Sequence, residues 1–229
     1  MKTIKTLFTL SIMVLIPFGS MIWIRTHQSS GFASIELILY PLLFGGLSIA
    51  FLFSLKKYFL KENLSDFNSG KGKWSSDILW GLALTAIYFI LFYVERLTLS
   101  NWLSFKPNME MLGLMLDMRT NLILLILWFG PVLWLGIALY EELIRVFILT
   151  SLWKFSNQKI WTLTVIIIAS TIIGLAHWSQ GSYGIVTIGI KSSVACFFFY
   201  KYKRLLPLII AHVLYDGIQV AILLITYPR

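Results

Sequence analysis

Long runs without a charged residue decide what this chain can fold into. The first run, Leu7–Ile24, is followed by six others of similar character. An α-helix needs about 20 apolar residues to cross roughly 30 Å of hydrocarbon. Charged residues make up only 13% of the 229 residues and hydrophobic ones 58%, whereas soluble domains are about one-quarter charged. This composition excludes a soluble globular fold and an intrinsically disordered chain, and it predicts an integral membrane protein.

The apolar runs predict an all-α fold, a polytopic transmembrane helix bundle of about seven spans. We expect the first span to be an uncleaved anchor, because no small-residue cleavage site follows it. The fourth run is too long for one ordinary span, and Gly130 followed by Pro131 predicts a kink within it. The predicted spans are Leu7–Ile24, Leu37–Leu55, Ile78–Val94, Thr120–Trp153, Ile160–His177, Tyr183–Tyr200 and Leu205–Tyr227.

The basic residues predict the orientation of the bundle. The formal net charge is +9, and the basic residues cluster between the apolar runs, as the positive-inside rule expects of cytoplasmic loops. With Lys2 and Lys5 inside, seven spans leave residues 95–119 and 180–183 outside, and they leave the basic clusters inside. The N-terminus is therefore expected to be cytoplasmic, the bilayer is the expected partner, and nucleic acid is not. These inside clusters are Lys56, Lys57 and Lys61, then Lys71 and Lys73, then Lys201, Lys203 and Arg204.

Ionisable residues at membrane depth are the main candidates for function, because each costs several kcal/mol unless it is paired or acts. We expect none inside the first three spans and six in the later ones. Lys191 is a possible seventh, which either joins the others or extends toward the headgroups. Residues three or four apart on a helix share a face. The six candidates are Glu141, Glu142 and Arg145 on the fourth span, His177 on the fifth, and His212 and Asp216 on the seventh.

These residue types suit the activation of water. Two adjacent carboxylates beside one arginine can differ, so that one stays ionised while the other serves as a general base. His177 and His212 could stabilise an oxyanion or bind a metal, and Asp216 could orient an imidazole. Each pair alone is more often structural, but three spans with such residues favour one site. We therefore expect the two histidines to converge across a polar cavity.

At these residues the sequence resembles the CPBP intramembrane protease family, also called the Abi or type II CAAX prenyl endopeptidase family. The family carries Glu-Glu-x-x-x-Arg, Phe-x-x-x-His and His-x-x-x-Asn/Asp motifs on successive core helices. Here Glu141–Arg145, Ile173–His177 and His212–Asp216 are similar to them. Arg145 comes one residue earlier than in the family, which rotates it by about 100° around a helix. Isoleucine replaces the phenylalanine.

The resemblance implies a division into residues 1–119, helices and loops without signature, and residues 120–229, a CPBP-like protease core. It further implies an intramembrane endopeptidase in the bacterial inner membrane, acting on a membrane-embedded or lipid-modified peptide. Glu141 would be the general base, Glu142 and Arg145 its partners, His177 and His212 the stabilisers or ligands, and Asp216 the partner of His212. The cofactor stays open: a divalent metal such as zinc is possible, but the chain lacks a His-Glu-x-x-His motif.

Two alternatives lead to different functions. The shifted Arg145 is compatible with a catalytically silent family member that acts as an immunity or scaffold protein in the membrane. Buried Glu, His and Asp side chains can also relay protons in a transporter. The seven spans show no evident inverted repeat, which disfavours the transporter.

Overall fold

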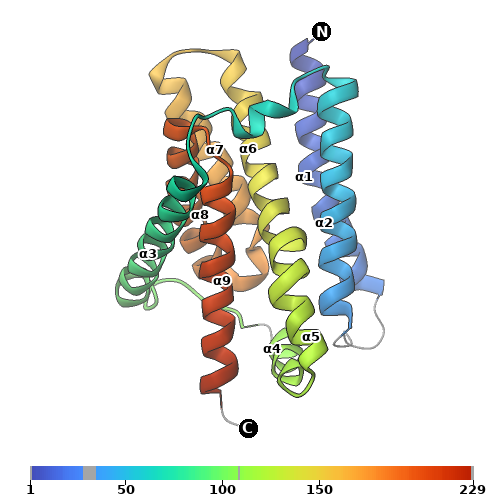
Figure 1. Ribbon diagram of the computed structural model, residues 1–229, viewed down its shortest axis with the longest axis vertical. Coiled ribbons are helices and arrows are strands. Elements are labelled where there is room, and N and C mark those ends of the chain that lie inside the picture. Colours follow the sequence, from blue (N-terminus) through green and yellow to red (C-terminus); the bar gives the residue numbers. More distant parts are fainter. Residues whose placement is uncertain (1, 28–34, 108, 228–229) are drawn as a thin grey trace. The chain divides into compact units, whose positions relative to one another are not determined.

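The computed structural model describes residues 2–27, 35–107 and 109–227. Within these ranges every regular element is helical and no strand occurs, which confirms the all-α prediction. Figure 1 follows the helices along the chain. The chain forms two compact units, and α6 (Tyr140–Leu152) and α9 (Leu206–Thr226) each contribute residues to both.

Six helical segments among the described residues are long and apolar enough to cross a membrane. They agree closely with the second to seventh predicted spans. The helix α1 (Lys2–His27) covers the first predicted span, and its apolar part within the described residues is the shorter Thr3–Ile16. The six segments are Glu36–Phe59, Trp74–Thr98, Leu122–Phe155, Lys159–Ala176, Trp178–Tyr202 and Leu206–Thr226.

The fourth predicted span is one long, kinked segment, as expected. Its first helix, α5 (Leu122–Leu127), begins after Asn121, whose side-chain oxygen accepts hydrogen bonds from the first free backbone N–H groups. At Gly130 the backbone leaves the helical region, with φ −88° and ψ −110°, directly before Pro131. The wider turns of η4 (Trp128–Leu139) then lead into α6, which ends in η5 (Trp153–Phe155). The kink thus precedes the helix that carries Glu141, Glu142 and Arg145.

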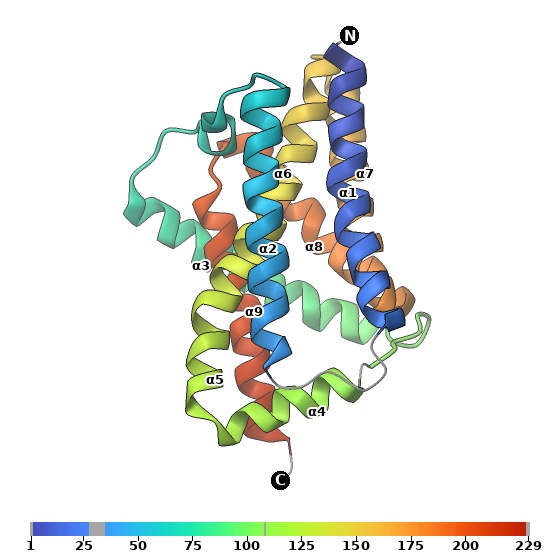
Figure 2. The same ribbon diagram turned by 90° about the vertical axis from the view of Figure 1, so that its right-hand side faces the viewer.

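Unit 1 consists of the described residues of 1–62, 108–141 and 213–229. Here α2 (Glu36–Ser54), continued by η1 (Leu55–Phe59), packs against α1 and η4 (Figure 2). The backbones of α2 and η4 approach closely at two glycines, since a Cβ atom on Gly45 would lie 2.7 Å from the carbonyl oxygen of Gly136. Small residues allow this kind of contact between membrane helices. Two short helices, α4 (Met109–Asp117) and η3 (Met118–Thr120), precede α5.

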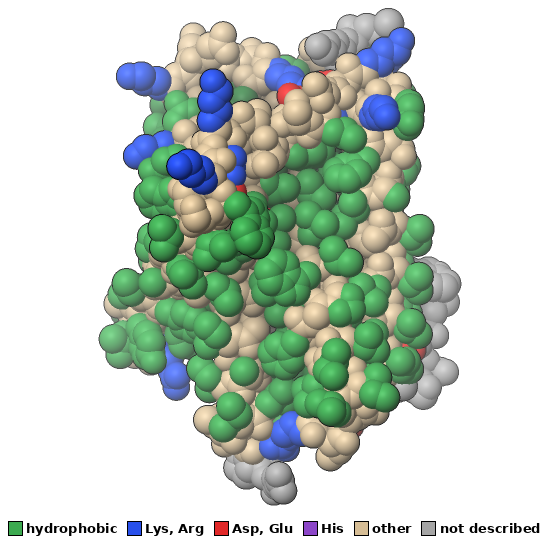
Figure 3. All heavy atoms as spheres, in the orientation of Figure 1, with side chains coloured by type: hydrophobic (Ala, Val, Ile, Leu, Met, Phe, Trp, Pro, Cys, Tyr) green, Lys and Arg blue, Asp and Glu red, His purple; other side chains and the backbone are tan. Residues whose placement is uncertain are grey.

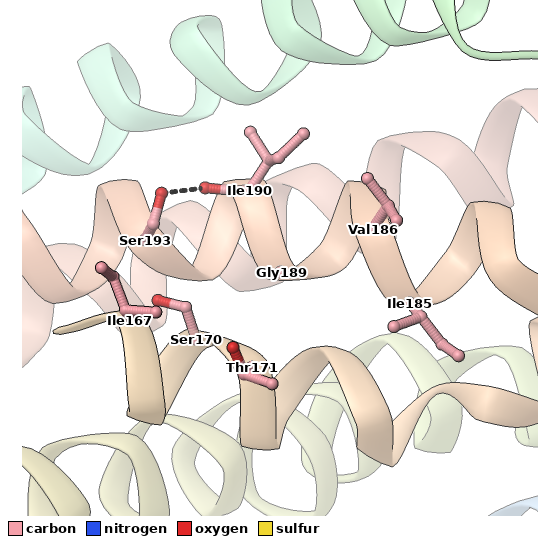
Figure 4. Close-up of a pocket in the computed structure, with 8 residues that line it drawn as sticks. All are labelled: Ile167, Ser170, Thr171, Ile185, Val186, Gly189, Ile190 and Ser193. Carbon is pink, nitrogen blue, oxygen red and sulfur yellow. Dashed lines mark hydrogen bonds between the residues drawn. The ribbon is translucent and has the colours of Figure 1, made fainter. Parts of the chain in front are cut away.

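Unit 2 consists of residues 63–107 and 142–212. Its main contact joins α7 (Lys159–Ala176) to α8 (Gly181–Tyr202), and α3 (Trp74–Thr98) packs against α8. Gly174 allows the close approach of α7 and α8. An open groove of about 350 Å³ lies between them (Figure 4), lined by Ile167, Ser170, Thr171, Ile185, Val186, Gly189, Ile190 and Ser193. The short helices η2 (Leu64–Asn68) and η6 (Trp178–Gln180) complete the unit.

Two basic loops that the sequence assigns to the same membrane side meet in unit 2. The backbone N–H of Gly70 donates to the carbonyl of Lys203 at 2.8 Å. The neighbouring Arg204 forms an ion pair with Asp77 at the start of α3 and donates to the Gly70 carbonyl at 2.9 Å. The loop before α3 and the loop after α8 therefore lie together, in agreement with the predicted sidedness.

Two loops assigned to the opposite side also meet in unit 2. Lys106 N–H donates to the Gln180 carbonyl at 3.0 Å, and Tyr183 N–H donates to the Ser104 carbonyl at 3.1 Å. The segment after α3 is thereby joined to the turn between α7 and α8. The start of α3 therefore lies near the end of α8, and the end of α3 lies near the start of α8, so the two helices are antiparallel.

Three charged residues that flank the predicted second and third spans lie inside the helical segments of the structure. Asp77 and Glu95 lie within α3 and are buried, and Lys56 is fully buried in η1. The helices continue beyond the predicted ends, and each of these charges has a partner: Arg204, Lys191 and Glu62, respectively. Pairing offsets the cost of burial, so the helix extends past the point where an unpaired charge would end it.

Hydrophobic side chains cover much of the face drawn in Figure 3. Both units expose large apolar residues along their membrane-length helical segments, where a soluble protein would place polar groups. This exposure agrees with contact to lipid along the spans. Examples are Leu47 and Ile126 in unit 1, and Leu79, Ile90, Leu163 and Ile167 in unit 2.

Candidate active site

A buried ion pair occupies the inner face of α6. Glu142 is 2% exposed and Arg145 is 5% exposed. Three residues apart on the helix, they share a face, and the guanidinium contacts carboxylate Oε2. The predicted pairing of an arginine with one of the two adjacent glutamates is therefore present, and in the structure that glutamate is Glu142.

A second helix fixes Arg145. Its Nε donates to the hydroxyl of Ser192 on α8 at 3.1 Å, and Ser192 is 1% exposed. One turn further along α8, the buried Cys196 accepts from the Ser170 hydroxyl on α7 at 3.7 Å. The guanidinium is therefore held between α6 and α8, so that its direction toward Glu142 does not depend on α6 alone.

A third helix brings His212 to the same carboxylate. Its Nδ1 lies 2.9 Å from Glu142 Oε1, and the His212 side chain is 14% exposed. An ionised carboxylate can only accept a hydrogen bond, so Nδ1 carries the proton. In the neutral ring Nε2 then holds the lone pair. The carboxylate orients the imidazole, which is the common way in which proteins select one histidine tautomer.

The half-buried His177 has a similar arrangement at the C-terminal end of α7. Its Nδ1 lies 2.9 Å from the carbonyl oxygen of Ile173, one turn earlier. The carbonyl is an acceptor, so Nδ1–H donates here too. Ile173, in the place of the family's phenylalanine, is itself buried. Both histidines thus use Nδ1 for support and present Nε2 as the second nitrogen.

The structure joins three of the six predicted residues through direct contacts: Glu142, Arg145 and His212. Glu141 and Asp216 are half-buried and belong to unit 1, whereas the other four belong to unit 2. The pairing of His212 with Asp216, the role of Glu141 and the convergence of the two histidines all stay predictions. Glu142 is the partner of His212 that the structure adds.

The side chains do not form a ready metal site. Among the described residues, no group of three or more His, Cys, Asp or Glu side chains is placed to hold a metal ion. The Glu142 carboxylate, which would be the central donor, engages Arg145 through one oxygen and His212 through the other. Within unit 2, both oxygens of this carboxylate are therefore already engaged by other side chains.

Two buried contacts were not expected from the sequence. Lys191 on α8 forms an ion pair with Glu95 on α3 and also donates to the Thr187 carbonyl at 3.4 Å. The predicted alternative, extension toward the headgroups, is replaced by this pairing. A signal was available, because a buried lysine within an apolar span requires a carboxylate partner, and Glu95 directly follows the predicted third span. No comparable signal marks Ser192, whose hydroxyl is an ordinary component of membrane helices.

The fold and this network define a polytopic membrane protein with a carboxylate, a guanidinium and an imidazole buried together. Residues 123–218 match the family model described as type II CAAX prenyl endopeptidase Rce1-like, which confirms the resemblance seen in the motifs. The matched segment runs from α5 into α9 and contains all six candidate residues. No curated protein and no solved structure matches the chain. At the level of the family, the match supports a CAAX-type intramembrane protease.

Proposed function

We propose that this chain is an endopeptidase of the bacterial inner membrane that hydrolyses a peptide bond in a membrane-embedded or lipid-modified peptide. The observation that carries the proposal is the Glu142–Arg145–His212 network, buried within the segment that matches the protease family. Such a network is costly in a membrane protein.

In the proposed reaction Glu141 takes a proton from water, whose oxygen attacks the carbonyl carbon of the scissile bond. A tetrahedral oxyanion forms, and Nε2–H of a protonated histidine donates a hydrogen bond to it. The protonated Glu141 then gives its proton to the leaving nitrogen as the C–N bond breaks. The products are a carboxylic acid and an amine, so the proton taken from water is accounted for.

The neighbours of Glu141 prepare this step. Glu142 accepts a hydrogen bond from Nδ1 of His212, and it thereby supports the imidazolium that the oxyanion requires. The carbonyl of Ile173 supports His177 in the same way. Arg145 supplies the counter-charge that lets Glu142 stay ionised among apolar side chains. Asp216, one helical turn after His212, is the proposed further partner of that histidine.

A second function is supported by the way Arg145 is bound. The guanidinium bridges Glu142 and Ser192 and thereby ties α6 to α8, so the network could serve as a structural lock in a catalytically silent immunity or scaffold protein. In that case a protective phenotype in cells would survive Glu141→Gln and would be lost on altering exposed loops. Under the protease proposal, Glu141→Gln abolishes the phenotype.

The direct test uses the full-length protein, purified in detergent and returned to liposomes. Fluorogenic membrane peptides, with and without a prenylated C-terminal cysteine, report cleavage. Replacing a general base lowers rates by about 10²–10⁴-fold, so Glu141→Gln should lose activity by at least two orders of magnitude, and His212→Gln should also be strongly impaired. Full activity in both variants would contradict the mechanism.

Glu36→Gln is the matched control. Glu36 is also a glutamate at a span, at the start of α2, where it accepts a hydrogen bond from the Tyr40 hydroxyl at 2.8 Å. It lies outside the residues of the proposed mechanism. Its substitution should leave cleavage within about twofold of the unsubstituted protein, as surface changes away from special features do.

A further inference from the structure

We infer that Ser192 is a positioning residue of the site, which acts through Arg145 and Glu142 to hold His212 in its Nδ1–H form. Ser192 is on α8 and touches none of the groups proposed to meet the substrate. Its hydroxyl accepts from Arg145 Nε at 3.1 Å. The inference rests on the proposed function in one respect, that His212 is a catalytic residue.

The contacts form one chain of hydrogen bonds and charges. Arg145 spans two acceptors, Ser192 through Nε and Glu142 through a terminal nitrogen. Glu142 in turn spans two donors, with Oε2 toward Arg145 and Oε1 toward His212. A carboxylate held at both oxygens cannot rotate without breaking one contact. The orientation of His212 therefore depends on a hydroxyl that is separated from it by two residues, Glu142 and Arg145, in this chain of contacts.

Burial makes the Ser192 hydroxyl difficult to replace as an acceptor for Arg145. Ser192, Arg145 and Glu142 are 1%, 5% and 2% exposed, so water does not readily replace a missing acceptor. A buried donor that loses its partner keeps its full desolvation cost. Without the hydroxyl, the guanidinium has to move to find another acceptor, and the carboxylate bound to it is released to turn away from His212.

The serine also accounts for the position of Arg145 in the sequence. Arg145 lies one residue earlier than the resembled family motif places its arginine, a rotation of about 100° around the helix. In that direction it still reaches Glu142, which is three residues earlier. Ser192 is the second acceptor that the rotated side chain meets. The displaced arginine is thus part of the network through two contacts.

The neighbouring Ser193 provides a matched control. Its hydroxyl donates to the Ile190 carbonyl of its own helix at 2.7 Å, and it lines the groove between α7 and α8 (Figure 4). Ser193→Ala removes the same atoms from the same helix, one residue away, without a contact to Arg145. It therefore separates the loss of a serine from the loss of this particular acceptor.

The experiment measures the tautomer of His212 in the full chain. Protein labelled with ¹⁵N-histidine is placed in detergent micelles at alkaline pH, where the ring is neutral, and His212→Gln assigns the signal. The unsubstituted protein should show Nδ1–H. In Ser192→Ala the ratio of Nδ1–H to Nε2–H should fall about tenfold, the effect of losing one hydrogen bond to a charged group. Ser192→Thr should preserve the ratio, and so should Ser193→Ala.

An unchanged ratio in Ser192→Ala, or an equal fall in Ser193→Ala, would overturn the inference. If Ser192→Ala does not fold, Ser192→Cys keeps the size of the side chain with a weaker acceptor and should give an intermediate fall. His177 is an internal reference, because its Nδ1–H donates to the Ile173 carbonyl and should not respond. The measurement needs no substrate, so absence of peptidase activity would contradict the proposed function and leave this result to decide on Ser192.

Discussion

Replacing Glu142 by glutamine should destabilise the protein far more than its small change in shape suggests. The side chain is 2% exposed and carries the negative charge between Arg145 and His212. Glutamine has almost the same volume but no charge, and its amide nitrogen cannot accept a hydrogen bond. The variant therefore leaves the guanidinium of Arg145, itself 5% exposed, as a buried cation without a counter-charge.

The magnitude follows from that uncompensated cation. Removing one partner of a buried ion pair costs about 3–5 kcal/mol, and at about 2–4 °C per kcal/mol for a chain of this size the melting temperature should fall by roughly 6–20 °C. Arg145→Gln should cost a similar amount, because it leaves the carboxylate unpaired. The double variant should cost about as much as one single variant, since it removes both charges together.

The assay is equilibrium unfolding in mixed micelles, followed by the fluorescence of the nine tryptophans and by helical circular dichroism. Unfolding free energies of the two single variants and the double variant form a double-mutant cycle, which isolates the pair. We expect a coupling of about 3 kcal/mol. Additive effects, or single variants within about 0.5 kcal/mol of the unsubstituted protein, would show that the buried pair does not hold this part of the fold together.

Two further predictions concern the packing of unit 2. Lys191→Met should destabilise by about 3 kcal/mol, because it leaves the carboxylate of Glu95 buried and unpaired; adding Glu95→Gln should restore most of the loss in the same unfolding assay. Gly174→Ala should separate α7 from α8, since its Cβ would lie 2.5 Å from the Ile185 carbonyl oxygen, whereas Gly189→Ala, with its nearest atom at 3.6 Å, should be tolerated; equal melting temperatures for the two alanine variants would contradict this packing.

Much of the fold could be predicted because the bilayer imposes one length on every crossing. The kink at Gly130 followed because a proline removes a backbone hydrogen bond. The ends of α3 could not be predicted in the same way. Asp77 and Glu95 resemble loop residues because they are charged. Only the ion pairs with Arg204 and Lys191, on distant segments, offset the free-energy cost of burying them. Apolar length locates a span, whereas the pairing of charges decides where its helix stops.

In the candidate site, too, contacts within one helix could be predicted, whereas contacts between distant segments could not. Spacing of three and four residues correctly placed Glu142 and Arg145 on one face of a helix. The contact between His212 and Glu142 joins residues far apart in the sequence, and the local alternative, Asp216, has the more obvious spacing. Ser192 could not be found at all, because a serine gives no signal until the helix opposite it is known. The sequence predicts which side chains share a face of one helix, but which distant side chains pair is known only once the packing of the helices is known.

The most direct test of the proposed function is whether cleavage of membrane-associated peptides in living cells requires Glu141. Cells that produce the unsubstituted protein or Glu141→Ala at equal abundance are compared by labelling new protein N-termini in the membrane fraction and identifying them by mass spectrometry. We expect a set of membrane-associated peptides with new N-termini that appear only when Glu141 is present. Identical sets of N-termini from both cell lines would contradict the peptidase and favour the silent membrane protein.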